Sequence, residues 1–212
     1  MAAAAANPMA ALTPPPPVSK KTIHMAGILV DVYGLDEVPP HAARVSCLWL
    51  HHPRTRAKED MSNIAARCVS AWNHQNGSSS GGGRGLIAAA FDQRNHGGRM
   101  VHAPGNAAWR DGNPTHAQDM FSIVAGTVAD QVGLMDAVGG YVFNDENGRD
   151  IDQHLALGVS LGGHSVWQLM FADPRVCAGV VVIGCPDYMG ECSSFLPGEL
   201  PFACISGAGQ IC

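Results

Sequence analysis

Short runs of apolar residues recur along this chain. They lack the alternating polar positions that are typical of a half-exposed strand. They lie at Val45–Leu50, Leu86–Phe91, Leu155–Ser160 and Val176–Ile183, and Met25–Tyr33 is a further candidate strand. A strand that is apolar on both faces is typical of a parallel sheet covered by helices on both sides. The runs therefore predict such a sheet.

Segments with the helical spacing of apolar residues separate these runs. They are residues 60–72, His116 to about Val138, and the stretch that follows Ser160 and stops at Asp173-Pro174. Strands that alternate with helices predict an α/β fold, with a mostly parallel sheet flanked by helices. We expect one domain: a disordered Ala/Pro-rich segment at 1–20, the core at 21–187 and an irregular tail at 188–212.

Charge and composition argue against several classes of function. The formal net charge is −5 and no Lys/Arg cluster occurs, so we expect no nucleic-acid partner. No apolar run reaches the roughly 18 residues of a membrane span, and the N-terminus does not look like a signal peptide. The seven cysteines are an odd number, and Cys47, Cys68 and Cys177 lie in apolar runs. We interpret them as reduced core thiols of a cytoplasmic protein, and we expect no metal and no cofactor.

The most informative motif is Gly158-Val159-Ser160-Leu161-Gly162, which reads G-x-S-x-G. An apolar strand candidate precedes it and a helix candidate follows it. A serine on such a sharp strand-to-helix turn is the pattern of a nucleophile elbow. The turn favours glycine neighbours, which have no Cβ to clash with adjacent segments.

Three stretches of this sequence together resemble the α/β-hydrolase fold, and more narrowly small intracellular serine hydrolases of fungal type. The stretches are Gly158–His164, the sequence DQRNHG at Asp92–Gly97, and His51-His52-Pro53-Arg54. The resemblance covers roughly residues 25–187. It is specific for the fold and carries little information about the substrate.

The resemblance implies a role for each matching residue near the nucleophile. Ser160 would attack an acyl carbon, and the backbone N–H of Leu161 would be one oxyanion donor. The second donor would come from the loop at His51–Arg54. Here His52 replaces the usual glycine and Pro53 has no N–H, so His52 or Arg54 would have to supply it.

The remaining polar residues of these stretches are expected to be structural. In the family the histidine at the position of His51 often has its ring bonded to loop backbone, and we favour that role over a catalytic one. Asp92, Arg94 and His96 would brace the loop after their strand. His164, in the first turn of the helix after Ser160, would pack or form hydrogen bonds.

The rest of a catalytic triad is not evident. In this fold the order is serine, acid, histidine, but no histidine follows His164. Asp187 follows the last predicted strand and could be the acid, although a turn residue is an equal interpretation. The resemblance stops near Asp187. We therefore expect that the last strands of the fold are missing and that the chain is truncated.

Two functions follow from these observations. The first is a serine hydrolase that cleaves a small-molecule ester, thioester or amide through an acyl-enzyme at Ser160. The alternative is a catalytically inactive hydrolase-fold protein that lacks the triad histidine, with or without the acid.

Overall fold

The computed structural model describes residues 13–76, 83–143 and 148–186. The strands are Lys20–Met25 (β1), Ile28–Tyr33 (β2), Arg44–His51 (β3), Gly85–Phe91 (β4), Asp150–Val159 (β5) and Val176–Val182 (β6). The α-helices are Ser62–Asn76 (α1), His116–Val142 (α2) and Leu161–Ala172 (α3). Short 3-10 helices are Lys58–Met61 (η2), Gly97–Arg99 (η3), Ala103–Asn106 (η4) and Trp109–Asp111 (η5).

The described strands form one mixed sheet in the order β1-β2-β4-β3-β5-β6. The pairs β3–β4, β3–β5 and β5–β6 are parallel, whereas β2 is antiparallel to both β1 and β4. The carboxyl ends of β3, β4 and β5 therefore meet at one end of the sheet, where ligands bind in open α/β sheets. The prediction of an α/β fold with a mostly parallel sheet is confirmed.

The prediction of one strand over Met25–Tyr33 is wrong. The segment contains a tight turn, because β1 ends at Met25 and β2 begins at Ile28. Ala26 has a φ of 49° and Gly27 a φ of 84°. Two consecutive left-handed residues are the geometry of a type I′ hairpin turn, whose twist matches that of the strands.

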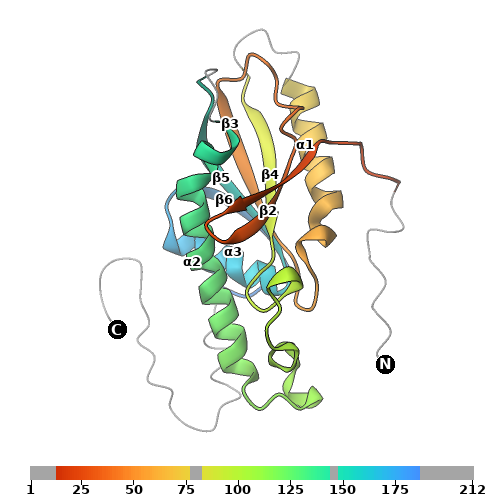
Figure 1. Ribbon diagram of the computed structural model, residues 1–212, viewed down its shortest axis with the longest axis vertical. Coiled ribbons are helices and arrows are strands. Elements are labelled where there is room, and N and C mark those ends of the chain that lie inside the picture. The colour runs from red at the N-terminus through yellow and green to blue at the C-terminus, as the bar shows by residue number, and fades with distance from the viewer. Residues whose placement is uncertain (1–12, 77–82, 144–147, 187–212) are drawn as a thin grey trace.

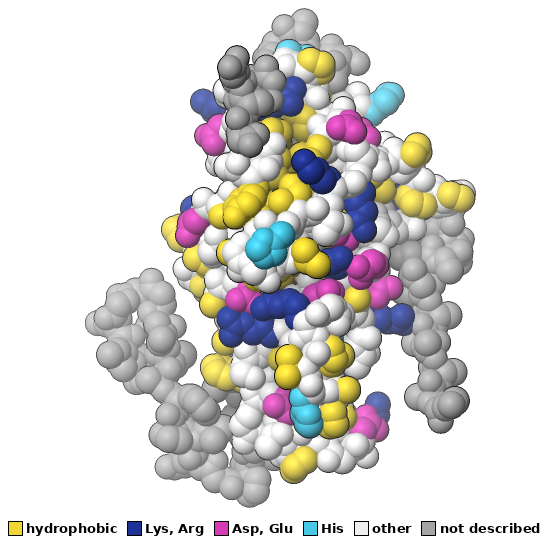
Figure 2. Space-filling model, viewed as in Figure 1, with side chains coloured by type: hydrophobic (Ala, Val, Ile, Leu, Met, Phe, Trp, Pro, Cys, Tyr) yellow, Lys and Arg dark blue, Asp and Glu magenta, His cyan; other side chains and the backbone are white. Residues whose placement is uncertain are grey.

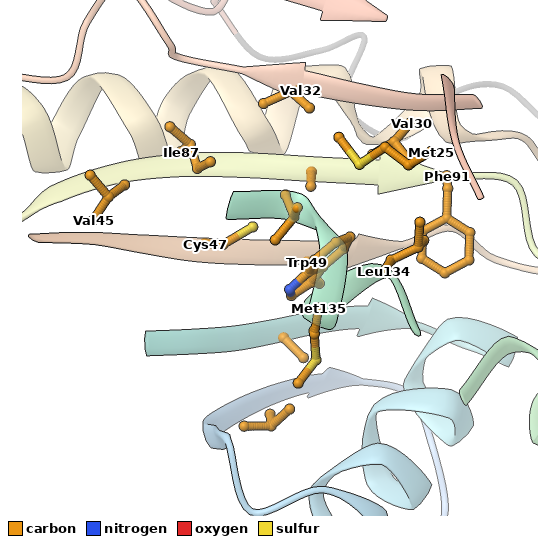
Figure 3. Packing of buried hydrophobic residues seen from close by; sticks show 14 of the residues in the cluster. Met25, Val30, Val32, Val45, Cys47, Trp49, Ile87, Phe91, Leu134 and Met135 are labelled. Atoms are coloured by element: carbon orange, nitrogen blue, oxygen red, sulfur yellow. The ribbon is translucent and has the colours of Figure 1, made fainter. Parts of the chain in front are cut away.

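Helices cover both faces of the sheet (Figure 1). On one face Met61, Ala65 and Val69, from η2 and α1, are buried in one apolar cluster with Leu50 of β3. On the other face α2 and α3 contribute to the larger cluster. Figure 3 shows Leu134 and Met135 of α2 lying beside Trp49 of β3, which is fully buried.

The last strand differs from its prediction as a buried strand. In the described chain β6 pairs only with β5 and forms an edge of the sheet. Val180, Val182 and Ile183 are consequently 53%, 43% and 79% exposed. Cys177 is exposed as well, so its assignment to the core is wrong, whereas Cys47 is buried and Cys68 is partly buried.

Helix α2 is, by its length and composition alone, apolar enough to cross a membrane. Leu134, Met135 and Val138 lie in the core against the sheet, which accounts for part of that apolar character. The absence of a membrane span stays a prediction.

A buried carboxylate anchors β2 to its neighbours. Asp31 is fully buried and lies 2.7 Å from Lys20 Nζ and 3.1 Å from Lys58 Nζ. Thr22 Oγ1 also donates to it, at 2.7 Å. Burial by itself would raise the pKa of Asp31, but the hydrogen bonds from Lys20, Thr22 and Lys58 hold that pKa below its usual value.

We expect Asp31→Ala to lower the free energy of unfolding by about 3 kcal/mol, because it removes the buried counter-charge of the mostly buried Lys58 and leaves it paired, among the described residues, only with the exposed Glu59. Asp152→Ala is the control, since Asp152 pairs with Arg84 and Arg44 nearer the surface, where such pairs contribute about 0–1 kcal/mol. Urea denaturation followed by tryptophan fluorescence measures both. Similar losses in the two variants would contradict this ranking.

Candidate active site

The turn at Ser160 joins the end of β5 to the start of α3. Ser160 has a φ of 54° and a ψ of −115°, a sparsely populated conformation for a residue with a Cβ. Such backbone strain costs on the order of 1–3 kcal/mol and persists only where the surroundings impose it. Here the Ser160 N–H donates to the Val182 carbonyl at 2.8 Å, and its own carbonyl accepts from Gly163 and His164.

The glycines of the motif allow three chain segments to approach closely. A Cβ on Gly158 would overlap the backbone carbonyl of Gly162. A Cβ on Gly162 would in turn overlap the carbonyl of His51, at the end of β3. The G-x-S-x-G spacing is therefore required by the contact between β3, β5 and α3.

The start of α3 offers hydrogen-bond donors beside Ser160. Leu161 is the first residue of the helix, and such N–H groups have no partner within the helix. They also lie at the positive end of the helix dipole, which favours negative charge. Among the described residues, the Oγ of Ser160 has no hydrogen-bond partner, so no described histidine is bonded to it as a base.

Apolar residues of α2 pack against this helix start. Leu161 is buried in a cluster with Met120, Ile123 and Val124, and the partly buried Phe121 packs against it. In Figure 1 the first turns of α2 and the segment before it extend beyond the end of β4. The serine turn therefore has an apolar neighbour on its α2 side.

His51 differs from the expected histidine bonded to loop backbone. Its ring is buried, contacts Phe91 edge-on at 5.6 Å between centroids, and makes no hydrogen bond of good geometry within the described chain. Burial lowers the pKa of His51 to about 4, although the nearby Gln131 side chain partly opposes the shift. The ring is therefore neutral at pH 7.

His52, rather than His51, makes the hydrogen bonds to loop backbone that were expected of His51. Its Nδ1 lies 2.8 Å from the Pro53 carbonyl, and its Nε2 accepts from the Gln93 N–H at 3.0 Å. Burial lowers the pKa of His52 to about 4. Both ring nitrogens are occupied, so an oxyanion donor at His52 could only be its backbone N–H.

The loop after β4 contains the other three polar residues singled out from the sequence. Asp92 accepts from the N–H groups of Lys58 and Gly98, each at 2.9 Å. The Nδ1 of His96 lies 2.9 Å from the Arg94 carbonyl, and burial lowers the pKa of His96. These contacts lie within and around the loop, and none of them reaches Ser160.

Arg94 and Arg99 both pair with Asp130 of α2, each at 2.7 Å, and so attach this loop to the helix. On the face drawn in Figure 2, basic and acidic side chains are interspersed and form no broad area of one sign.

His164 lies where the described part of the site ends. The N–H of Cys185 donates to His164 Nδ1 at 3.3 Å, which attaches the segment after β6 to the first turn of α3. Asp187 lies outside the described residues, and its role as an acid stays a prediction. No group of three or more His, Cys, Asp or Glu side chains in the described residues could hold a metal ion.

Sequence reasoning missed two buried residues, Gln93 and Ser165. The Gln93 side chain donates to the His52 carbonyl at 2.5 Å, and its Oε1 accepts from Ser165 Oγ at 3.1 Å. Gln93 is adjacent to Asp92 in the motif, but a sequence gives no signal for a contact between residues 52, 93 and 165.

No protein-family model matches the sequence, and no curated protein matches it. Solved structures do match. TT1662 from Thermus thermophilus has a TM-score of 0.54 and 18% identity, over 87% of this chain and 60% of that one. Epoxide hydrolase A from Mycobacterium thermoresistibile has a TM-score of 0.43 and 17% identity, over 77% of this chain and 38% of that one. The α/β hydrolase GrgF from Penicillium sp. sh18 has a TM-score of 0.44 and 17% identity, over 79% of this chain and 46% of that one.

This chain thus spans 60% or less of the length of these three structures. At such low identity the likeness establishes the fold alone. With the strand order of the sheet, it gives the chain the α/β-hydrolase fold.

We expect Gly162→Ala to lower the free energy of unfolding by about 2–3 kcal/mol, because the new Cβ overlaps the backbone of His51. Gly133→Ala is the matched control on α2, where a Cβ meets nothing within 4 Å. That change should stabilise the protein by about 0.5–1 kcal/mol, as alanine does inside helices. Thermal and urea denaturation measure both, and a stabilising Gly162→Ala would contradict the close contact.

Stability should fall as the pH drops from about 6.5 to about 4. In this range the unfolded chain protonates His51 and His52, whose ordinary pKa is 6.5, whereas the folded chain keeps both rings neutral. Each ring therefore lowers the free energy of unfolding by about 1.4 kcal/mol per pH unit, and above pH 6.5 the effect is absent.

Denaturation at a series of pH values measures this slope. His51→Gln should reduce the slope by the contribution of one buried ring. The substitution His24→Gln, at an exposed histidine, should leave the slope unchanged. An unchanged slope in His51→Gln would contradict the neutral buried ring.

Proposed function

We propose that this protein is a serine hydrolase of the α/β-hydrolase superfamily, with Ser160 as nucleophile in a nucleophile elbow. The observation that carries the proposal is the conformation of Ser160, a left-handed serine held between a parallel strand and the first turn of a helix. Strain of this kind clusters at functional sites, where it presents a side chain that a relaxed turn would not. The Oγ is partly exposed and free of hydrogen bonds in the described chain.

The reaction that suits this geometry is acyl transfer. Ser160 Oγ attacks the carbonyl carbon of an ester, thioester or amide and gives its proton to a base. The carbonyl oxygen becomes an oxyanion, which the Leu161 N–H accommodates at the helix start. Collapse expels the protonated alcohol, thiol or amine, and water then releases the acid from the acyl-enzyme and restores the serine.

The surroundings of Leu161 favour an acyl group with an apolar part. Met120, Ile123 and Val124 pack against Leu161, so an apolar wall adjoins the oxyanion donor. We propose a small-molecule substrate and no cofactor.

A second candidate function is binding without catalysis. It is favoured by the observation that no described histidine ring is hydrogen-bonded to the Oγ of Ser160, while Asp187, the proposed acid, lies outside the described residues. Loss of the base in a serine hydrolase leaves about 10³–10⁴-fold catalysis over water. The two candidates therefore differ in rate by a measurable amount.

A fluorophosphonate probe should label the purified protein, and mass spectrometry of peptides should place the adduct on Ser160. Ser160→Ala should remove the adduct. Ser122→Ala, an exposed serine on α2, should leave the labelling rate unchanged. Folded wild-type protein that stays unlabelled would reject the hydrolase and favour the binding function.

A further inference from the structure

Gln93 connects the loop at His51–Arg54 to helix α3, the two segments that would supply the oxyanion donors of the proposed reaction. It lies just after β4 and is fully buried. Its backbone N–H and its side-chain amide both donate to His52, to the ring Nε2 at 3.0 Å and to the carbonyl at 2.5 Å. Its Oε1 accepts from Ser165 on α3, at 3.1 Å. All polar groups of this side chain are therefore used between these two residues.

The contact with the ring fixes the tautomer of His52. A neutral imidazole has one donor and one acceptor nitrogen. Because Nε2 accepts from Gln93, the proton lies on Nδ1, which then donates to the Pro53 carbonyl at 2.8 Å. The lowered pKa of His52 keeps the ring in this form at neutral pH.

The contact with Pro53 orients the next peptide group. The described chain contains no cis peptide, so the Pro53 carbonyl and the Arg54 N–H point in opposite directions. The carbonyl points to the His52 ring, and it also accepts from the Arg56 N–H at 3.3 Å. The Arg54 N–H therefore points away from the ring, and it has no acceptor among the described residues.

The contact with Ser165 connects this arrangement to the nucleophile. Ser165 Oγ lies 3.4 Å from the Leu161 carbonyl, one helical turn earlier in α3. Leu161 is the proposed first oxyanion donor, and Ser160 directly precedes it at the start of α3. A displacement of the Gln93 side chain would thus move the loop at His52–Arg54 relative to α3.

We propose that Gln93 is a positioning residue, which through His52 holds the Arg54 backbone N–H as the second oxyanion donor. This assigns the donor that the motif leaves open between His52 and Arg54. Gln93 itself touches no reacting atom. The inference rests on the proposed role of Ser160.

The test compares Gln93→Met with Asn73→Leu. Both side chains are buried amides, but that of Asn73 on α1 is hydrogen-bonded to the backbone of Leu86 at the start of β4, at the other end of the strand from Gln93. Fluorophosphonate labelling of Ser160 gives kinact and KI separately. We expect kinact to fall about 100- to 1,000-fold in Gln93→Met, the cost of one oxyanion donor, with KI unchanged. In Asn73→Leu kinact should stay within twofold of the wild type.

Nitrogen NMR supplies a readout that does not depend on catalysis. At pH 7 the His52 ring should be the neutral Nδ1-protonated tautomer. In Gln93→Met the resonances of that ring and of the Arg54 amide should move, and in Asn73→Leu they should not. If Gln93→Met does not fold, Ser165→Ala takes its place. It should also lower kinact and move the His52 and Arg54 resonances, but by smaller amounts.

The outcomes separate the two proposals. Unchanged kinact in folded Gln93→Met, or unchanged His52 and Arg54 resonances, overturns the role of Gln93. If wild-type protein is not labelled at all, the proposed hydrolase fails, and the NMR comparison alone then decides whether Gln93 orients the Arg54 peptide.

Discussion

The backbone conformation of Ser160 is the constraint on which the surrounding structure depends. A left-handed serine is unfavourable, and it is held by a hydrogen bond from its N–H to β6 and by two bonds to its carbonyl from α3. The same turn brings Gly158 and Gly162 so close to neighbouring backbone that no Cβ fits. Strand β6, the end of β3 and the start of α3 therefore meet at this one turn, through the hydrogen bonds of Ser160 and the close approach of Gly162 to His51.

Around this turn the polar frame is built from neutral groups. His51 and His52 are buried as uncharged rings, and Gln93 and Ser165 add an amide and a hydroxyl. The nearby ion pairs of Arg94 and Arg99 with Asp130 remain partly exposed to water. A developing oxyanion would thus meet dipoles fixed beforehand in a poorly solvated place, where hydrogen bonds are stronger than in water.

The sequence was sufficient to predict the layers of the fold, but not to predict every strand correctly. The runs at Val45–Leu50 and Leu86–Phe91 were predictable because both of their faces are buried. The hairpin at Ala26-Gly27 was not predictable, because its turn lies within an apolar run. Strand β6 has the composition of a central strand, although it lies at an edge of the sheet that the described residues form. The motif likewise predicted a strand-to-helix turn at Ser160, which lies between β5 and α3. The Gln93 contacts join residues 52, 93 and 165, which no local pattern connects.

Oxyanion binding and proton transfer are separable in this chain. The groups that would hold the oxyanion, Leu161 and the Gln93-supported loop, belong to the described core and depend on its packing. This frame includes no assigned base or acid, because Asp187, the proposed acid, lies outside the described residues. Since oxyanion stabilisation persists when a triad residue is lost, the frame could bind an anionic tetrahedral group whether or not Ser160 is deprotonated efficiently. Tight binding of a transition-state analogue would therefore not by itself establish turnover, and the rate of covalent reaction at Ser160 is the decisive quantity.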